Sequence, residues 1–360
     1  MLWFIATVVG VSLALAGGPA FPAPLDAAVE CSPLAAPVPA AQRKFHPGHY
    51  VAVGRVEAGN LRFAAATPGI SGVQRRYRWA QLEPQEGRYD LTAIAQDLRI
   101  ASAAGVQLVA MVEDKTFDGT VPTPSYLQDG EHTLRGPRGS VAARWNPLVV
   151  DRFTQLIAAI GARFDCDPSF EGIALQETAL SLDPGTLRTA GYSAEKYRDS
   201  LIRILRGAAA GVPRSRVFWY MNFLPGNQGY LDDIALAVVG TGVVMGGPDI
   251  LPENSALAQR VYPIYRRFHG RLPLFGSMQH DSYRHPRGAV GPDAAAKSRP
   301  DDLWSMEELF VFARDELHVD YVFWEYRTRR SPPHSRDWNE AREVIARHPE
   351  LRARRAGAGT

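Results

Sequence analysis

Acidic side chains that directly follow short apolar runs are the residues of this sequence best suited to chemistry. Glu177 follows the run Gly-Ile-Ala-Leu-Gln, and Glu325 follows Tyr-Val-Phe-Trp. Two carboxyl groups beside one bond can act as general acid and general base, and partial burial helps a carboxyl keep the proton that it donates. Glu177 and Glu325 are therefore the candidates for a catalytic pair, with Asp281 and Asp249 in reserve, and the choice of this pair depends on a resemblance described below. The structural alternative for Glu177 is a salt bridge to an arginine such as Arg76.

Polar and aromatic residues recur near the ends of other apolar runs. Sugars have apolar C–H faces and hydroxyl edges, so aromatic rings with fixed carboxylates and amides are the expected lining of a sugar site. This pattern predicts a carbohydrate-binding surface that comprises Arg76, Trp79, Glu113, Gln176, Asn222, Asp249, Gln279, Asp281 and Trp324.

The elements that position these residues are short β-branched or aromatic runs that alternate with longer stretches of helical period, a pattern typical of parallel βαβ units. Eight repeats predict a single (β/α)8 barrel, in which the loops after the strands converge on one face. A doubly wound open sheet is the alternative, although no G-x-G-x-x-G follows the first strand. The predicted strands are Tyr50–Arg55, Gly72–Tyr77, Gln107–Val112, Gly172–Gln176, Arg216–Met221, Val243–Gly246, Leu272–Ser277 and Tyr321–Trp324.

Helix signals fill the segments between the predicted strands. Asn146 followed by Pro147 is an N-cap with a first-turn proline, and apolar residues then fall on one face of a helix as far as Phe164. Ser305 and Glu308 form a capping-box pattern ahead of another helix. These signals agree with the crossover helices of a barrel.

The segment after the second predicted strand carries the pattern W-x-x-L-E-P-x-x-G-x-Y-D, from Trp79 to Asp90. It resembles the retaining glycoside hydrolases of clan A, especially the β-galactosidase-like barrels. The resemblance implies that Glu83 and Glu86 shape the rim of the barrel and take no part in the chemistry.

The resemblance also implies roles for residues near the fourth, seventh and eighth strands. The clan has an Asn-Glu pair after strand four, so Glu177 would be the general acid and base, with Gln176 in place of the Asn. Trp324 would stack against a sugar. The nucleophilic Glu of strand seven has no counterpart, because Gln279 occupies that position and cannot attack as a carboxylate does. Glu325 is therefore the expected partner of Glu177.

The distance between the two carboxyl groups would set the stereochemistry. Retaining glycosidases hold them about 5–5.5 Å apart, whereas inverting ones leave about 6.5–9.5 Å for a water molecule. The fourth and eighth strands face each other across the barrel, which favours the wider gap and an inverting mechanism. Alternation along the eighth strand leaves a second possibility, in which Glu325 points outward and Trp324 points inward.

Length and composition suit one large exported domain. The chain has 360 residues, 46% of them hydrophobic and 22% charged, with a formal net charge of +2. This balance gives no reason to expect a nucleic-acid partner. We expect residues 1–16, possibly to about residue 23, to be a signal peptide. The expected remainder is an extension over 17–48, a barrel domain over 49–350 and a tail over 351–360.

The apolar first segment predicts export to the periplasm or the medium, without stable membrane insertion after cleavage. Ala14-Leu-Ala16 offers a cleavage pattern, but no Lys or Arg precedes the apolar run, so an uncleaved anchor is the alternative. In an oxidising compartment Cys31 and Cys166 either form a disulfide, which would tie the N-terminal extension beneath the barrel, or stay as free thiols.

The resemblance and the predicted rim residues together imply a glycoside hydrolase that acts on a polysaccharide or oligosaccharide without a cofactor. One rival is a non-catalytic carbohydrate-binding barrel, as the Gln279 position permits. A second rival is a metal-assisted hydrolase that uses Asp249, Asp281 and His280, although their spacing matches no strong ligand motif.

Overall fold

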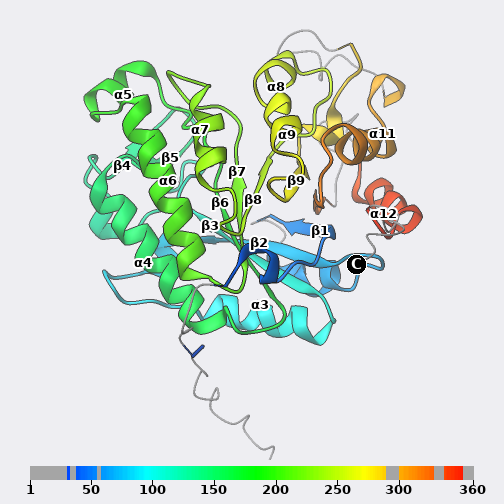
Figure 1. The fold of residues 1–360 in the computed structure, drawn as a ribbon, viewed down its shortest axis with the longest axis horizontal. Helices are drawn as coiled ribbons and strands as arrows, with labels where there is room; N and C mark the ends of the chain where they lie inside the picture. Colours follow the sequence, from blue (N-terminus) through cyan, green and yellow to red (C-terminus); the bar gives the residue numbers. More distant parts are fainter. Residues whose placement is uncertain (1–30, 33–37, 55–57, 289–299, 328–335, 352–360) are drawn as a thin grey trace, which may run out of the picture.

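A closed barrel of eight parallel strands forms the centre of the molecule, with helices around it (Figure 1). The computed structural model describes residues 31–32, 38–54, 58–288, 300–327 and 336–351. The strands follow the order β1-β10-β9-β8-β7-β6-β3-β2, so the predicted (β/α)8 barrel is confirmed and the open-sheet alternative is wrong. The strands are β1 Gly48–Val53, β2 Gly72–Arg78, β3 Gln107–Glu113, β6 Phe170–Leu175, β7 Arg216–Tyr220, β8 Val243–Gly247, β9 Leu274–Met278 and β10 Tyr321–Glu325.

A small antiparallel sheet lies outside the barrel, in the long connection between β3 and β6. It pairs β4 (Thr133–Arg135) with β5 (Ser140–Ala142). The sequence signals did not predict this hairpin. The helices are α1 Leu61–Ala65, α2 Trp79–Leu82, α3 Thr92–Ala103, α4 Pro147–Phe164, α5 Pro184–Thr189, α6 Ala194–Gly211, α7 Tyr230–Ala237, α8 Ser255–Arg260, α9 Tyr262–Phe268, α11 Met306–Val311 and α12 Trp338–Arg347.

The predicted helix starts are confirmed by their caps. The Asn146 side chain accepts a hydrogen bond from the Leu148 N–H at 2.9 Å at the start of α4. Ser305 and Glu308 form the reciprocal capping box of α11. Each cap satisfies backbone donors that the first turn of a helix leaves open. Local chemistry therefore fixes where these helices begin.

Alternation along the strands divides the apolar side chains between two cores. One set fills the inside of the barrel and comprises Tyr50, Val109, Met111, Ala174, Phe218, Tyr220, Val244, Phe275, Tyr321 and Phe323. The larger set lies between the strands and the surrounding helices. Because side chains alternate with a period of two, a residue two positions beyond an interior residue also faces the barrel axis. This rule identifies the residues that point into the mouth, which we define as the end of the barrel where the strands have their carboxyl termini.

The N-terminal extension lies against the opposite end of the barrel. Arg43 donates hydrogen bonds to the backbone carbonyls of Ala209 and Val212 at 3.0 and 3.1 Å. Cys31 and Cys166 form a disulfide with 5.4 Å between their Cα atoms, so the free-thiol alternative is wrong. Cys166 lies between the end of α4 and the start of β6, away from the mouth. The disulfide therefore ties the extension beneath the barrel, as predicted.

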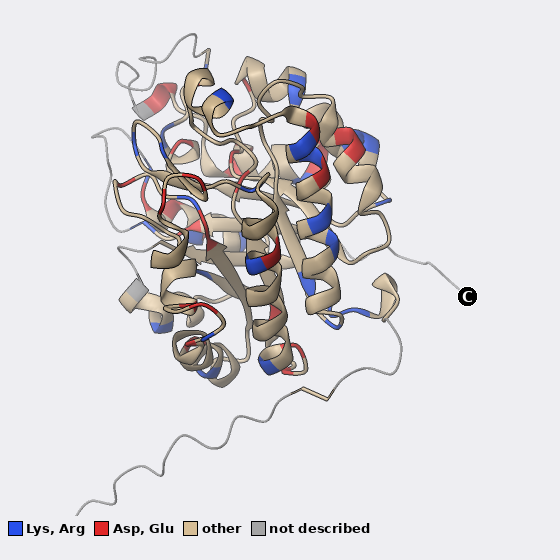
Figure 2. Cartoon of the chain, turned by 90° about the vertical axis from the view of Figure 1, so that its left-hand side faces the viewer, with Lys and Arg blue, Asp and Glu red and all other residues tan. Residues whose placement is uncertain are grey.

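The predicted signal peptide lies outside the described residues, as does nearly all of the predicted tail. No helix in the described segments is long and apolar enough to cross a membrane. Basic and acidic residues are interspersed over the helices and loops in Figure 2. This mixture agrees with the small net charge of +2.

Candidate active site

Residues from five strands face the barrel axis at the mouth. Interior residues Gln74, Met111, Ala174, Tyr220 and Phe323 each lie two positions before a polar residue. By the two-residue period these polar residues also face the axis. They are Arg76, Glu113, Gln176, Asn222 and Glu325. The barrel thus gathers five of the residues predicted from the sequence at one end.

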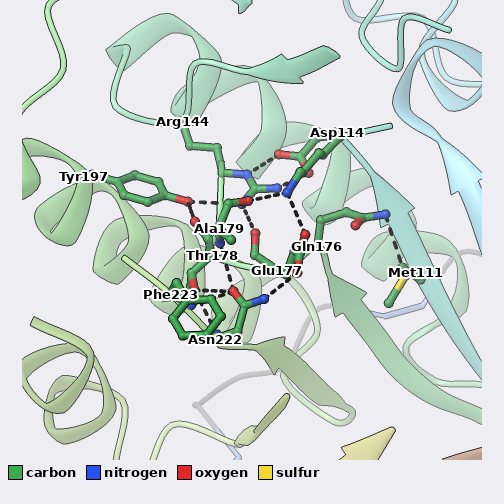
Figure 3. A network of polar contacts seen from close by, with 11 residues as sticks. Met111, Asp114, Arg144, Gln176, Glu177, Thr178, Ala179, Tyr197, Asn222 and Phe223 are labelled. Atoms are coloured by element: carbon green, nitrogen blue, oxygen red, sulfur yellow. Dashed lines mark hydrogen bonds and ion pairs between the residues drawn. The ribbon is translucent and has the colours of Figure 1, made fainter. Parts of the chain in front are cut away.

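Glu177 lies just beyond β6, and both of its carboxylate oxygens accept hydrogen bonds (Figure 3). The Lys115 ammonium donates to Oε1 at 2.6 Å, and the Asn222 side-chain amide donates to Oε2 at 2.5 Å. The Lys115 side chain is 1% exposed and that of Glu177 is 16% exposed. One cation and one amide thus hold the two oxygens of the Glu177 carboxyl group in place. Lys115, and not Arg76, is the ionic partner of Glu177.

The burial of Lys115 also affects the pKa of its ammonium group. Burial lowers the pKa of its ammonium, while the charge of Glu177 acts in the opposite direction. The ammonium also donates to the backbone carbonyl of Ala179 and lies 4.5 Å from the centre of the Phe117 ring. These contacts hold one cation at a fixed position beside the carboxylate.

Asn222 is oriented by three backbone and side-chain donors. Its Oδ1 atom accepts from the Ala179 N–H at 3.0 Å, the Phe223 N–H at 2.7 Å and the Thr178 hydroxyl at 3.2 Å. This arrangement leaves the Nδ2 group directed at Glu177 (Figure 3). The two ends of the amide therefore have separate roles, one in the loop and one at the carboxylate.

A buried ion pair supports the backbone on which Glu177 lies. Arg144 contacts both oxygens of Asp114 at 2.5 and 2.6 Å. The same guanidinium donates to the backbone carbonyl of Glu177 at 2.7 Å, and the Tyr197 hydroxyl donates to the backbone carbonyl of Thr178 at 2.9 Å. Packing of Asp114, Arg144 and Tyr197 thus restricts the loop after β6.

Asp249 is a second carboxyl group within electrostatic reach of Glu177. It follows β8 and is partly exposed. Burial, together with the charges of Glu177 and Asp281, raises the pKa of Asp249 to about 7. The protonated form of Asp249 is therefore favoured up to about pH 7, whereas the Glu177 carboxylate accepts hydrogen bonds from Lys115 and Asn222. Two carboxyl groups in such opposite environments are typical of acid and base partners.

Glu325 faces the mouth but has a different neighbourhood. Its carboxylate pairs with Arg327 at 3.0 Å. Burial lowers the pKa of the nearby His280, and the charges of Arg327 and Arg284 lower it further. Glu325 thus belongs to a group of charges after β9 and β10. The charges that raise the pKa of Asp249 are those of Glu177 and Asp281.

Two tryptophans predicted to bind sugar do not face the mouth, and both predictions are corrected. Trp324 is 0% exposed, and its indole N–H donates to His49 Nδ1 at 3.0 Å beside Phe310 of α11. Trp79 is also 0% exposed and packs against Phe153 of α4. Alternation explains the outcome for Trp324, because Phe323 and Glu325 occupy the inward positions on either side of it. The possibility that Glu325 points outward is therefore wrong.

The loop after β2 has the structural role that the resemblance implied for Glu83. This carboxylate is 0% exposed, accepts from the Trp79 indole at 2.7 Å and the Gly87 N–H at 2.9 Å, and pairs with Arg152. Glu86 is exposed and lies 3.9 Å from Arg152. Neither side chain belongs to the group around Glu177.

The two glutamines predicted to bind sugar, Gln176 and Gln279, differ in their exposure. Gln176 is 7% exposed and its amide lies 3.9 Å from the Met111 sulfur. Gln279, just beyond β9, is partly exposed. Asp281 is exposed and pairs with Arg284 at 2.7 Å. Among the described residues, no group of three or more His, Cys, Asp or Glu side chains is arranged to hold a metal ion.

Sequence reasoning did not predict the contacts that Glu177 makes. Asn222 and Lys115 were expected at the rim, and Lys115 comes two residues after the end of β3, but their hydrogen bonds to Glu177 were not foreseen. Arg144 and Tyr197 reach the site from a long loop and from α6, so their contacts depend on the packing of α4 and α6. Nothing in the local sequence indicates those contacts.

Comparisons with known proteins agree on the fold. No protein-family model matches the chain, and no curated protein matches it. The catalytic domain of beta-amylase from Paenibacillus polymyxa has 10% sequence identity and a TM-score of 0.55, with 84% of this chain and 99% of that chain covered. A GH5_18 protein from Streptomyces cattleya, in complex with Manb1-4GlcNAc, has 13% identity and a TM-score of 0.51, covering 84% and 80%.

The exo-beta-1,4-mannosidase Op5Man5 from Opitutaceae bacterium strain TAV5 has 13% identity and a TM-score of 0.48. The match covers 80% of this chain and only about half, 54%, of that protein. The beta-amylase and GH5_18 structures, whose TM-scores exceed 0.5, share the barrel fold with this chain, and one barrel fold supports many chemistries.

Proposed function

We propose that this chain is a glycoside hydrolase that cleaves the glycosidic bonds of a polysaccharide or oligosaccharide at the barrel mouth. The observation that carries the proposal is the pair of carboxyl groups in opposite environments. Glu177 accepts hydrogen bonds from Lys115 and Asn222, and the pKa of Asp249 is raised to about 7, mainly by burial. The fold likeness to beta-amylase and to a GH5_18 protein bound to Manb1-4GlcNAc also supports it.

In the proposed reaction Asp249 donates its proton to the leaving glycosidic oxygen as the bond to the anomeric carbon breaks. The ionised Glu177 faces the positive charge that develops on the sugar. Glu177 then acts in one of two ways. It accepts a proton from a water molecule that attacks the anomeric carbon, or it attacks that carbon itself and forms a covalent glycosyl-enzyme. In the second case water breaks the bond between Glu177 and the sugar, and Asp249, which has lost its proton to the leaving group, accepts a proton from that water. The anomeric form of the first product, measured by NMR, distinguishes these routes. Inversion means that Glu177 activates water, and retention means that it is the nucleophile.

This assignment replaces Glu325 by Asp249 as the preferred partner of Glu177. A general acid must carry a proton near the working pH, and the pKa of Asp249 is raised to about 7, whereas Glu325 pairs with Arg327 at 3.0 Å. Glu325 remains the second candidate because it faces the same mouth. The two assignments differ in which variant loses activity.

The first experiment measures reducing-sugar release from a panel of polysaccharides. We expect Glu177→Gln and Asp249→Asn each to lower kcat by roughly 10²–10⁴-fold, the contribution of a positioned acid or base, and Glu325→Gln to change it by less than about tenfold. Circular dichroism checks that the variants are folded. Loss of activity in Glu325→Gln together with an active Asp249→Asn would identify Glu325, and not Asp249, as the partner of Glu177.

A non-catalytic carbohydrate-binding barrel is the second candidate function. It is favoured by Gln279, which stands after β9 where the resemblance placed the nucleophile. This candidate predicts oligosaccharide binding that survives Glu177→Gln, with no product from the unmutated protein on the same ligand. Turnover of any polysaccharide that depends on Glu177 would exclude it.

We further propose that the protein works in an oxidising compartment outside the cytoplasm. The Cys31–Cys166 disulfide supports this location, since structural disulfides persist mainly in exported proteins. The apolar first segment supports it independently. Fractionation of cells that produce the full chain tests the proposal, and a reduced protein found in the cytoplasm would contradict it.

A further inference from the structure

Two arginines at the end of β2 face the axis of the barrel. Gln74, on the same face, donates a hydrogen bond to the Tyr220 hydroxyl inside the barrel at 2.9 Å. The two-residue period therefore turns Arg76 and Arg78 toward the mouth. Burial raises the pKa of Tyr220 to about 12, and the charge of Arg76 acts against that rise. The Arg76 guanidinium thus lies near the interior of the barrel.

Within the described residues, both guanidinium groups have donors that no acceptor of the protein uses. Arg76 lies 3.9 Å from Glu113, and Arg78 lies 3.9 Å from Asp118. Both distances exceed hydrogen-bond length, and in the described part of the chain neither arginine side chain donates a hydrogen bond; Nε of Arg78 is buried without a partner. The two side chains are 28% and 34% exposed. A ligand in the mouth can therefore reach them.

Two other arginines of the barrel have closer carboxylate partners. Arg75, which faces outward from the same strand, pairs with Asp97. Arg144 contacts both oxygens of Asp114 at 2.5 and 2.6 Å. Arg76 and Arg78 differ from these two because each is 3.9 Å from its nearest carboxylate partner.

The strand order places these arginines across the mouth from a candidate catalytic group. In the closed eight-stranded order, β8 is four strands from β2 and therefore opposite it, and β6 is two strands away. Asp249 follows β8 and Glu177 follows β6. Asp249 thus follows the strand opposite the two arginines, and Glu177 follows a strand a quarter of the way around the barrel from them. A sugar between them would meet carboxylates at its anomeric carbon and arginines at another edge.

We propose that Arg76 and Arg78 form a subsite for the carboxylate of an acidic sugar, so that the substrate contains uronic acid. The proposal rests on the proposed glycosidase function. The guanidinium fork matches a carboxylate with two parallel hydrogen bonds and is weakly hydrated. Glu113 and Asp118 offset the charge of the two arginines, so recognition comes from directed donors more than from net charge. We therefore expect only a modest effect of salt.

The test compares a glucuronic-acid polysaccharide with the same polymer after its carboxyl groups have been reduced to neutral alcohols. We expect the wild type to show at least a tenfold higher kcat/KM on the carboxylated polymer. Arg76→Gln should bring the ratio of the two kcat/KM values close to one. Arg76→Lys, which keeps the charge and loses the fork, should give an intermediate ratio. Arg203→Gln, an exposed arginine of α6, should keep the wild-type ratio.

Three results would overturn the proposal of a carboxylate subsite. These are equal cleavage of the two polymers by the wild type, an unchanged ratio in both Arg76→Gln and Arg78→Gln, and a preference for a sulfated neutral polymer. If neither polymer is cleaved, binding decides the question separately from the hydrolase proposal. Calorimetry would then measure a uronic-acid oligosaccharide with Glu177→Gln protein. Binding that Arg76→Gln abolishes supports the subsite, and absence of binding overturns it.

Discussion

At the scale of single residues, the hydrogen-bond donors to the Glu177 carboxylate lie far away in the sequence. The resemblance implied a general acid at this position. In the structure the carboxylate accepts from Lys115 and Asn222, which are 62 and 45 residues away. Because both carboxylate oxygens accept hydrogen bonds, we propose Glu177 as the base or nucleophile. The proton donor is then best sought at Asp249, where burial and two neighbouring carboxylates favour the neutral form.

The raised pKa of Asp249 predicts a dependence of stability and activity on pH. Its pKa rises from the ordinary value of 3.8 to about 7 in the folded protein. Between these values the folded state binds more protons than the unfolded state, so stability falls as pH rises through this window. Hydrolysis that needs the protonated Asp249 should also fall as pH rises through about 7.

Asp249→Asn removes this titration and should stabilise the protein above pH 7, by at most roughly 4 kcal/mol at ~1.4 kcal/mol per pKa unit. Below about pH 4 it should give no gain, because Asp249 is then protonated in the folded and unfolded states. Urea denaturation at a series of pH values measures the effect. Asp199→Asn, at an exposed position of α6, is the control. An Asp249→Asn variant with the pH dependence of the wild type would contradict the assignment.

The sequence correctly predicted which polar residues follow the strands. It did not correctly predict the direction in which every side chain near a strand end points. Glu177, Asn222 and Asp249 follow their strands as expected. Trp324 was assigned to the sugar site from the resemblance, but it lies between the inward-facing Phe323 and Glu325 and points toward α11. A strand end shows only that a residue is near the mouth. Which residues of a strand point toward the barrel axis depends on the packing of the whole strand.

At the scale of elements, the loop after β2 is organised around one buried carboxylate. Glu83 accepts hydrogen bonds from the Trp79 indole and the Gly87 N–H. It also pairs with Arg152 of α4. The motif that resembled a glycosidase family is therefore a connection between the rim and a neighbouring helix, which positions the end of β2 and its arginines.

Removal of this carboxylate should affect stability more than catalysis. Glu83→Gln leaves Arg152 buried without its charge partner, and breaking a buried pair in this way costs about 3–5 kcal/mol. We expect a lower free energy of unfolding, measured by urea denaturation, with kcat per folded molecule almost unchanged. Glu86→Gln is the matched control, since Glu86 is 63% exposed. Loss of turnover without loss of stability would instead give Glu83 a part in the chemistry.

The elements of the barrel were predictable because each strand carries its own signal. All eight predicted strands overlap the observed ones, and the helix starts at Asn146 and Ser305 follow from local capping. Barrel closure followed from the number of repeats. The β4–β5 hairpin was not predicted, because its strands are three residues each and depend on contacts such as the one between Thr116 and Ser140.

At the scale of the whole molecule, the two ends of the barrel have separate roles. The candidate active site lies at the carboxyl ends of the strands, and the N-terminal extension covers the opposite end. Lys44 donates to the carbonyls of Asp165 and Asp167 at 3.0 and 2.7 Å there, and His46 pairs with the buried Glu171 at 2.6 Å. Stability and activity should therefore respond to different groups of residues.

The disulfide gives a test of this separation. Cys31 and Cys166 are 135 residues apart, and a cross-link over such a long stretch restricts the unfolded chain by roughly 2–5 kcal/mol of free energy. Replacing both cysteines by serine should lower the thermal midpoint of unfolding by several degrees, and a reducing agent should lower that of the wild type by a similar amount. Because the bond lies at the end of the barrel away from Glu177 and Asp249, kcat and KM at temperatures well below unfolding should stay at wild-type values. A variant that keeps its thermal midpoint but loses turnover would show instead that the extension beneath the barrel controls the geometry of the mouth.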